Sequence, residues 1–98
     1  MKNKKSQNKQ LAKTGVVSWT PNAWEDYLSW QKEDLSMVDK INLLIEECLR
    51  NPFTGTGKPE PLKGDLTGYW SRRITHELRL VYLPEDGKIY VVSCRYHY

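Results

Sequence analysis

The chain has 98 residues, which is room for one compact domain and no second. Its hydrophobic fraction of 39% and charged fraction of 28% are typical of a small soluble protein, and no apolar run approaches the roughly 20 residues that cross a membrane. The net charge of +3 is uneven: residues 1–14 hold five lysines and no acid, residues 15–47 two bases and seven acids, and residues 48–98 eight bases and five acids. The basic second half indicates a phosphate-binding surface, although mixed surface charge also serves solubility alone.

The first 14 residues predict a flexible basic tail ahead of a single domain at 15–98. They contain little beyond lysine, asparagine and glutamine, so they cannot bury enough apolar surface to become ordered. They also lack the apolar segment of a secretory signal. Two cysteines, Cys48 and Cys94, are too few for a disulfide scaffold, which favours a cytoplasmic protein.

Two helices are predicted after a short strand at 16–19. Thr20-Pro21 has the form of a helix start, a capping threonine followed by a first-turn proline, and apolar residues continue at helical spacing to about residue 31. Ser36-Met-Val-Asp39 has the form of a capping box for the second helix, which Asn51-Pro52 ends. The apolar face of this helix is marked by Met37, Val38, Ile41, Leu44, Ile45, Cys48 and Leu49.

The second half of the chain predicts strands. Glycines and prolines make 53–61 an irregular loop, whereas the β-branched and aromatic runs at 69–74, 78–83 and 88–94 are typical of strands, the last two joined by a turn at 84–87. Helices grouped before a strand meander predict an α+β domain, with two N-terminal helices packed on one face of a twisted antiparallel sheet. The opposite face of the sheet is left for a partner or substrate.

Glu60 and His97 are candidates for acid–base work. Glu60 lies between two prolines, which forbid a helix and hold its carboxylate on a stiff extended segment. His97 lies close to where the last predicted strand ends, between two tyrosines. A solvated loop glutamate and a half-buried terminal histidine are the ordinary alternatives.

Arginines supply the cations that such a site needs. Arg72 and Arg73 are adjacent in a strand and therefore point to opposite faces of the sheet. Arg79 lies on the polar side of the next strand, near them across the hairpin. The alternative is a salt bridge at the rim, with Glu77 or Asp65 as the acid.

A base, an acid and several cations without a metal-ligand set are the requirements of metal-free RNA cleavage. The base takes the proton of the ribose 2′-hydroxyl, the acid protonates the departing 5′-oxygen, and the cations stabilise the charge on phosphorus. The two histidines have no metal-ligand spacing, so we expect neither a metal nor another cofactor.

Several segments together match one bacterial family. They are Trp24-Glu-Asp-Tyr27, Trp30-Gln31, Asn51-Pro-Phe53, Gly57-Lys-Pro-Glu-Pro-Leu-Lys63, Leu66-Thr-Gly-Tyr-Trp-Ser-Arg-Arg-Ile-Thr75, Arg79-Leu-Val-Tyr82 and Cys94-Arg-Tyr-His-Tyr98. In order and spacing, from about Val17 to the last residue, they resemble the Txe/YoeB toxins of bacterial toxin–antitoxin modules, which belong to the RelE superfamily of ribosome-dependent mRNA endonucleases. The tail at 1–14 precedes the usual start of that family.

The resemblance implies a role for each candidate. Glu60 is similar to the family's general base, His97 to its general acid and Arg79 to the arginine that stabilises the scissile phosphate. Supporting positions are matched by Lys63, Arg73 and Tyr98. The resemblance also implies a twisted antiparallel sheet with two helices on one side, mRNA in the ribosomal A site as substrate, a YefM-like antitoxin as partner, and a homodimer as an allowed state.

A non-catalytic α+β module that binds RNA or protein is the alternative function. Such a module needs Arg79 to grip phosphate but has no use for a proline-flanked glutamate and a terminal histidine. The joint presence of Glu60, Arg79 and His97 therefore favours the enzyme.

Overall fold

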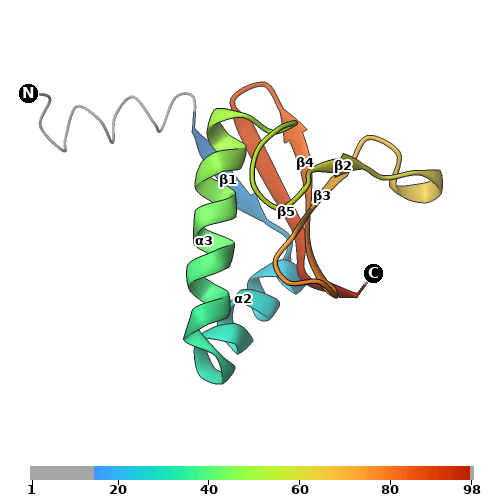
Figure 1. The fold of residues 1–98 in the computed structure, drawn as a ribbon. Helices are drawn as coiled ribbons and strands as arrows, with labels where there is room; N and C mark the ends of the chain where they lie inside the picture. The colour runs from blue at the N-terminus through green and yellow to red at the C-terminus, as the bar shows by residue number, and fades with distance from the viewer. Residues whose placement is uncertain (1–14, 98) are drawn as a thin grey trace, which may run out of the picture.

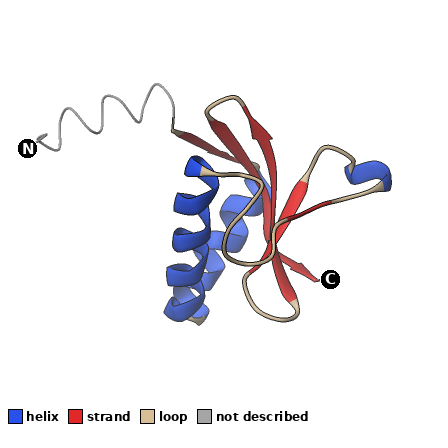
Figure 2. Cartoon of the chain, turned by 45° about the horizontal axis from the view of Figure 1, so that its top comes forward, coloured by secondary structure: helices blue, strands red, loops and turns tan. Residues whose placement is uncertain are grey.

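The expected α+β architecture is confirmed by a computed structural model, which describes residues 15–97. Helices α2 (Pro21–Glu33) and α3 (Leu35–Arg50) lie on one side of a five-stranded sheet, as Figure 1 shows. The strands are β1 (Val16–Trp19), β2 (Glu60–Pro61), β3 (Trp70–Arg73), β4 (Leu78–Glu85) and β5 (Lys88–His97), and the short 3-10 helix η1 (Gly64–Leu66) follows β2. Neither α2 nor α3 covers the other face of the sheet in Figure 2. The predicted tail at 1–14 lies outside the described residues.

The strand order is β1-β5-β4-β3-β2, and the sheet is mixed. Strand β1 runs parallel to β5, whereas the other neighbours are antiparallel, so the sheet is mostly antiparallel, as expected, with one parallel pair at its edge. The parallel pair arises because two helices and three strands separate β1 from β5, and this long connection lets the chain return in the same direction.

The start of α2 is as predicted, but the start of α3 is not. The Thr20 hydroxyl accepts a hydrogen bond from Ala23 N at 3.1 Å, as an N-cap does. The cap of α3 is Asp34 rather than Ser36, because Asp34 Oδ1 accepts from Ser36 N at 3.0 Å. The backbone N–H of the same residue donates to Trp30 O at 2.8 Å and closes α2, so one residue ends the first helix and begins the second.

The core lies between α3 and the sheet. Every apolar position predicted for the buried face of α3 is buried apart from Leu49, which packs against the core while partly exposed. The sheet contributes Ile74, Leu80, Tyr82, Ile89, Val91 and Cys94. This amphipathic packing holds the helix layer to the sheet and leaves its other face open.

Several strand boundaries differ from the prediction, and β3 is one residue shorter at each end than the predicted 69–74. Pro84 pairs with Ile89 and Glu85 with Lys88, so the turn shrinks from four residues to Asp86-Gly87. Gly87 has φ 68, a left-handed conformation that glycine adopts without steric cost. At the other ends, β5 continues to His97, and Glu60–Pro61 forms a short edge strand inside the predicted loop.

Within the described residues, none of the helices combines the length and the apolar character that crossing a bilayer requires.

Candidate active site

Glu60 reaches Arg79 across the edge of the sheet. Strand β2 places Glu60 opposite Ser71 of β3, and the flanking prolines confine the backbone to an extended path. The Glu60 carboxylate lies 3.5 Å from Arg79 Nη1. The carboxylate is 47% exposed and the arginine side chain only 2%, so the pair has one solvent-facing and one buried member. Two of the predicted site residues are thus in contact.

Arg73 and Arg79 lie directly opposite each other on β3 and β4. Directly paired strand residues project on the same face, so the two arginine side chains leave the sheet next to each other. Arg73 Nε is buried without a hydrogen-bond partner in the structure. Like charges at such positions repel each other, and the Glu60 carboxylate reduces that repulsion. A phosphate group is the kind of ligand that would complete this arrangement.

The end of β5 lies beside this pair of arginines. Tyr96 is the partner of Arg79 in the strand ladder, and the exposed His97 is the partner of Leu78, one position along. Lys63, also exposed, precedes η1 three residues after Glu60. Tyr98 lies outside the described residues. The structure therefore gathers Glu60, Arg73 and Arg79 on one face of the sheet, whereas His97, one ladder position away beside Leu78, falls on the other face by strand alternation.

Helix α2 holds the C-terminal strand where its pairing is irregular. The register of β4 against β5 shifts on both sides of Val81, close to Cys94. Asp26 Oδ2 accepts from Cys94 N at 3.2 Å, and Trp30 Nε1 donates to Cys94 O at 2.9 Å. The Arg95 guanidinium stacks on Trp30, 3.9 Å from the ring centre. These contacts set the direction in which β5 continues to His97.

The sequence does not indicate these contacts of Asp26 and Trp30. Trp30 belongs to one of the motifs of the resemblance, but nothing in the helical periodicity predicts that its indole N–H donates to a carbonyl 64 residues away. Such long-range polar contacts carry no local pattern.

The two cysteines are unsuited to nucleophilic work. Burial raises the pKa of Cys48 to about 11 and that of Cys94 to about 12. Both thiols therefore stay protonated at neutral pH, and the thiolate is the reactive form.

Residues 15–97 contain no cluster of three or more histidine, cysteine, aspartate or glutamate side chains that could hold a metal ion.

Comparison with known proteins identifies similar chains. The model of the family described as "YoeB-like toxin of bacterial type II toxin-antitoxin system" matches residues 19–98. "Toxin YoeB" of Escherichia coli (strain K12) is 55% identical over 80 residues, which is 82% of this chain and 95% of that protein. The YoeB dimer from Staphylococcus aureus superposes with a TM-score of 0.80 at 51% identity, covering 85% of this chain and 97% of that one. The matching chain of the heterotetrameric YoeB–YefM toxin–antitoxin complex from the same organism superposes with a TM-score of 0.79 at 52% identity. The match covers 84% of this chain and 95% of that one.

Replacing Trp30 with phenylalanine should destabilise the fold by about 2 kcal/mol, because the buried Cys94 carbonyl loses its donor. Trp24→Phe is the matched control, since Trp24 is 46% exposed, and it should cost under about 1 kcal/mol. Chemical denaturation of both variants measures the difference. Equal losses would show that the indole hydrogen bond contributes nothing.

Proposed function

The chain belongs to the YoeB toxin family of bacterial type II toxin–antitoxin systems, and we propose that it is a ribosome-dependent mRNA endonuclease. It would cleave mRNA in the ribosomal A site, in the cytoplasm, and so inhibit translation. The observation that carries this proposal is the approach of Glu60 to Arg79 at 3.5 Å, beside a second arginine and next to the end of β5.

The proposed reaction assigns one task to each group. Glu60 takes the proton of the ribose 2′-hydroxyl, whose oxygen then attacks the adjacent phosphorus. The bond between phosphorus and the 5′-oxygen breaks, and His97 gives its proton to that oxygen. Arg79 stabilises the additional negative charge on the phosphate during the attack. Arg73 and Lys63 support phosphate binding, and we assign Tyr98 to the same supporting group.

Burial of Arg79 supports its proposed role. A guanidinium that is 2% exposed is held in place by its surroundings and needs little reorganisation when charge develops next to it. The half-exposed Glu60 carboxylate remains accessible to a ribose. A module that only binds RNA would benefit from the arginines but not from this carboxylate, which repels phosphate.

We further propose that a YefM-like antitoxin neutralises the chain. The similar toxin from Staphylococcus aureus forms a heterotetramer with YefM, and a YoeB dimer is known from the same organism, which supports a homodimer here as well. The basic residues around Glu60 would attract an acidic antitoxin segment that folds on binding.

Cleavage of a translated message should leave a 2′,3′-cyclic phosphate or 3′-phosphate on one fragment and a 5′-hydroxyl on the other. This follows from attack by the neighbouring 2′-hydroxyl. End-labelling of fragments from programmed ribosomes, with and without prior phosphatase treatment, distinguishes the termini. A 5′-phosphate product would contradict the mechanism, and absence of cleavage would favour the binding module.

The substitution His97→Gln should lower the rate of single-turnover cleavage by about 10²-fold or more, because glutamine keeps a hydrogen-bonding side chain but cannot act as the acid. The melting temperature should stay close to that of the wild type, since His97 is exposed at the end of β5. His76→Gln, in the exposed turn between β3 and β4, is the control and should cleave normally. Unchanged cleavage by His97→Gln would remove the residue from the site.

Production of the chain alone should arrest bacterial growth, and co-production of the cognate antitoxin should restore it. The arrest should disappear with Glu60→Gln, which removes the proposed base while leaving a side chain of the same size. Growth curves combined with circular dichroism of the purified chains give the answer. A folded wild-type chain that is harmless at high expression would contradict the toxin activity.

A further inference from the structure

The proposed chemistry leaves unexplained a fully buried cation next to the site. Arg72 of β3 is 0% exposed, and its position in the strand turns it away from the face that carries Arg73. A buried guanidinium is costly unless each donor finds an acceptor. The identity of those acceptors shows what the residue does.

Arg72 is bonded to the loop that connects α3 to β2, residues 51–59. Its terminal nitrogens donate to three backbone carbonyls of this loop, those of Asn51, Thr54 and Thr56. The bonds to Thr54 O and Thr56 O measure 2.8 and 3.1 Å. One side chain thus contacts the loop at its beginning and in its middle.

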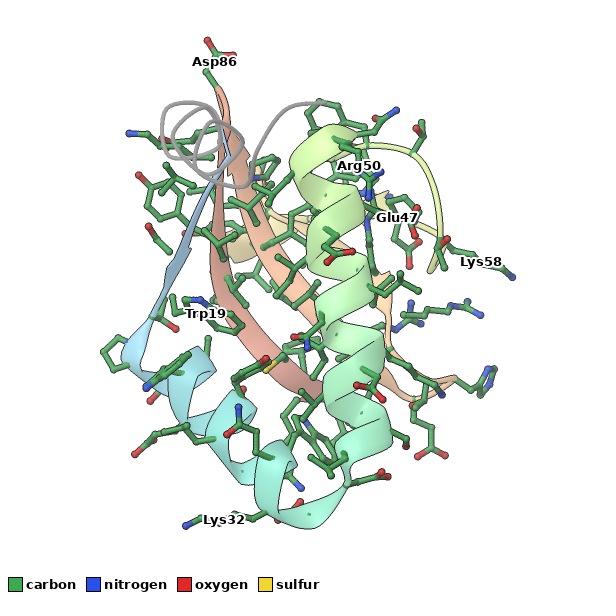
Figure 3. All side chains as sticks on the ribbon, turned by 90° about the vertical axis from the view of Figure 1, so that its left-hand side faces the viewer. Trp19, Lys32, Glu47, Arg50, Lys58 and Asp86 are labelled. Carbon is green, nitrogen blue, oxygen red and sulfur yellow. The ribbon has the colours of Figure 1, made fainter. Side chains whose placement is uncertain are left out.

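Two further side chains complete this set of contacts. Arg72 Nε donates to the Tyr82 hydroxyl at 3.2 Å, and that hydroxyl donates to Pro52 O at 2.6 Å. Glu47 of α3 lies 3.8 Å from Arg72 Nη1 and accepts from Thr56 N at 3.1 Å. We call Arg72, Tyr82 and Glu47 the loop clamp. Figure 3 shows Glu47 near the end of α3, beside the loop, with Lys58 projecting away from the helix.

The loop lies so close to the clamp that side chains would not fit between them. A Cβ atom on Gly55 would come within 2.6 Å of Glu47 Oε1, and one on Gly57 within 3.1 Å of Arg72 Cβ. Both glycines have positive φ, and the next residue, Lys58, has φ 48, which is uncommon for a residue with a side chain. Such backbone persists only where its surroundings determine it, and the clamp provides these surroundings.

The clamped loop leads directly to Glu60. Gly57 O accepts from Arg73 N at 2.6 Å, which fixes the loop to β3 at the position that pairs with Arg79. Only Lys58 and Pro59 separate this point from Glu60, and the proline makes the connection stiff. The conformation of the loop therefore determines where the Glu60 carboxylate lies.

We infer that Arg72 is a positioning residue, which holds the 51–59 loop through the clamp so that Glu60 meets Arg79. This inference rests on the proposed function, because it assigns Arg72 an effect on cleavage through Glu60. Arg72 itself lies on the helix-facing side of the sheet, opposite the face that carries Glu60 and Arg79.

The variant Tyr82→Phe tests the clamp without removing the buried charge. It deletes the hydroxyl that joins Arg72 to Pro52 while keeping the ring in the core. Single-turnover cleavage at saturating ribosomes should slow about tenfold, with half-saturation little changed, because the base is displaced while phosphate binding is intact. Amide exchange at Thr56 and Arg73 should accelerate. Tyr27→Phe is the matched control, since it loses a hydroxyl hydrogen bond of 2.6 Å, to Asn42, and should change neither readout.

The same substitution made in the Glu60→Gln variant distinguishes an effect on the position of Glu60 from a general loss of structure. If the clamp acts through Glu60, Tyr82→Phe should have no further effect on the residual cleavage by Glu60→Gln. Equal slowing in both backgrounds would overturn the inference, as would an unaltered rate for Tyr82→Phe in a wild-type protein that cleaves. A wild-type protein that does not cleave would refute the proposed function instead.

Two glycines offer an independent variant pair. Gly57→Ala should slow cleavage more than Gly68→Ala, because both glycines have positive φ but only Gly57 contacts the clamp region, whereas Gly68 has no atom within 4 Å of an added Cβ. The backbone strain is thereby matched. Equal cleavage rates for the two folded variants would mean that the contact between the loop and Arg72 does not position Glu60.

Discussion

The need to satisfy a buried guanidinium shapes the half of the molecule that carries the candidate site. Arg72 enters the interior because β3 alternates its side chains, and Arg73 takes the other face. Removing a charge from water is costly, so the loop after α3 brings its backbone carbonyls to the guanidinium. The same bonds satisfy polar backbone groups that an irregular loop would otherwise leave to solvent.

The loop clamp also contains an ion pair between Glu47 and Arg72. The hydrogen bonds from Thr56, helped by the Arg72 guanidinium, hold the pKa of Glu47 below its usual range. A depressed carboxyl pKa contributes stability at neutral pH that is lost as the pH falls through the folded-state value. The contribution of Glu47 to the clamp is therefore present at neutral pH, when its carboxyl is ionised, and is lost in acid.

The candidate site is assembled from two chain segments, each held by contacts on the helix-facing side of the sheet. The loop clamp fixes the segment leading to Glu60, and α2 fixes the segment leading to His97 through Asp26 and Trp30. Both sets of contacts lie on the helix-facing side of the sheet. Glu60 lies in the edge strand β2, and His97 lies at the end of β5. This arrangement keeps Arg73 and Arg79 paired on the face turned away from the helices, although like charges at paired strand positions repel each other.

The order of helices and strands, the apolar face of α3 and the extended mount of Glu60 could all be predicted from the sequence, because each depends on local signals: periodicity, caps and prolines. The start of α3 was misplaced since Asp34 and Ser36 are both good caps, and the tight junction with α2 decides between them. The sequence places Arg72 and Arg73 on opposite faces of the sheet, but it does not show what each arginine contacts. Which arginine is buried, which carbonyls it binds, and how the irregular pairing of β5 sets the direction of His97 all depend on contacts between residues far apart in the chain. Such contacts leave no periodic trace in a single sequence, so the tertiary structure alone decided them.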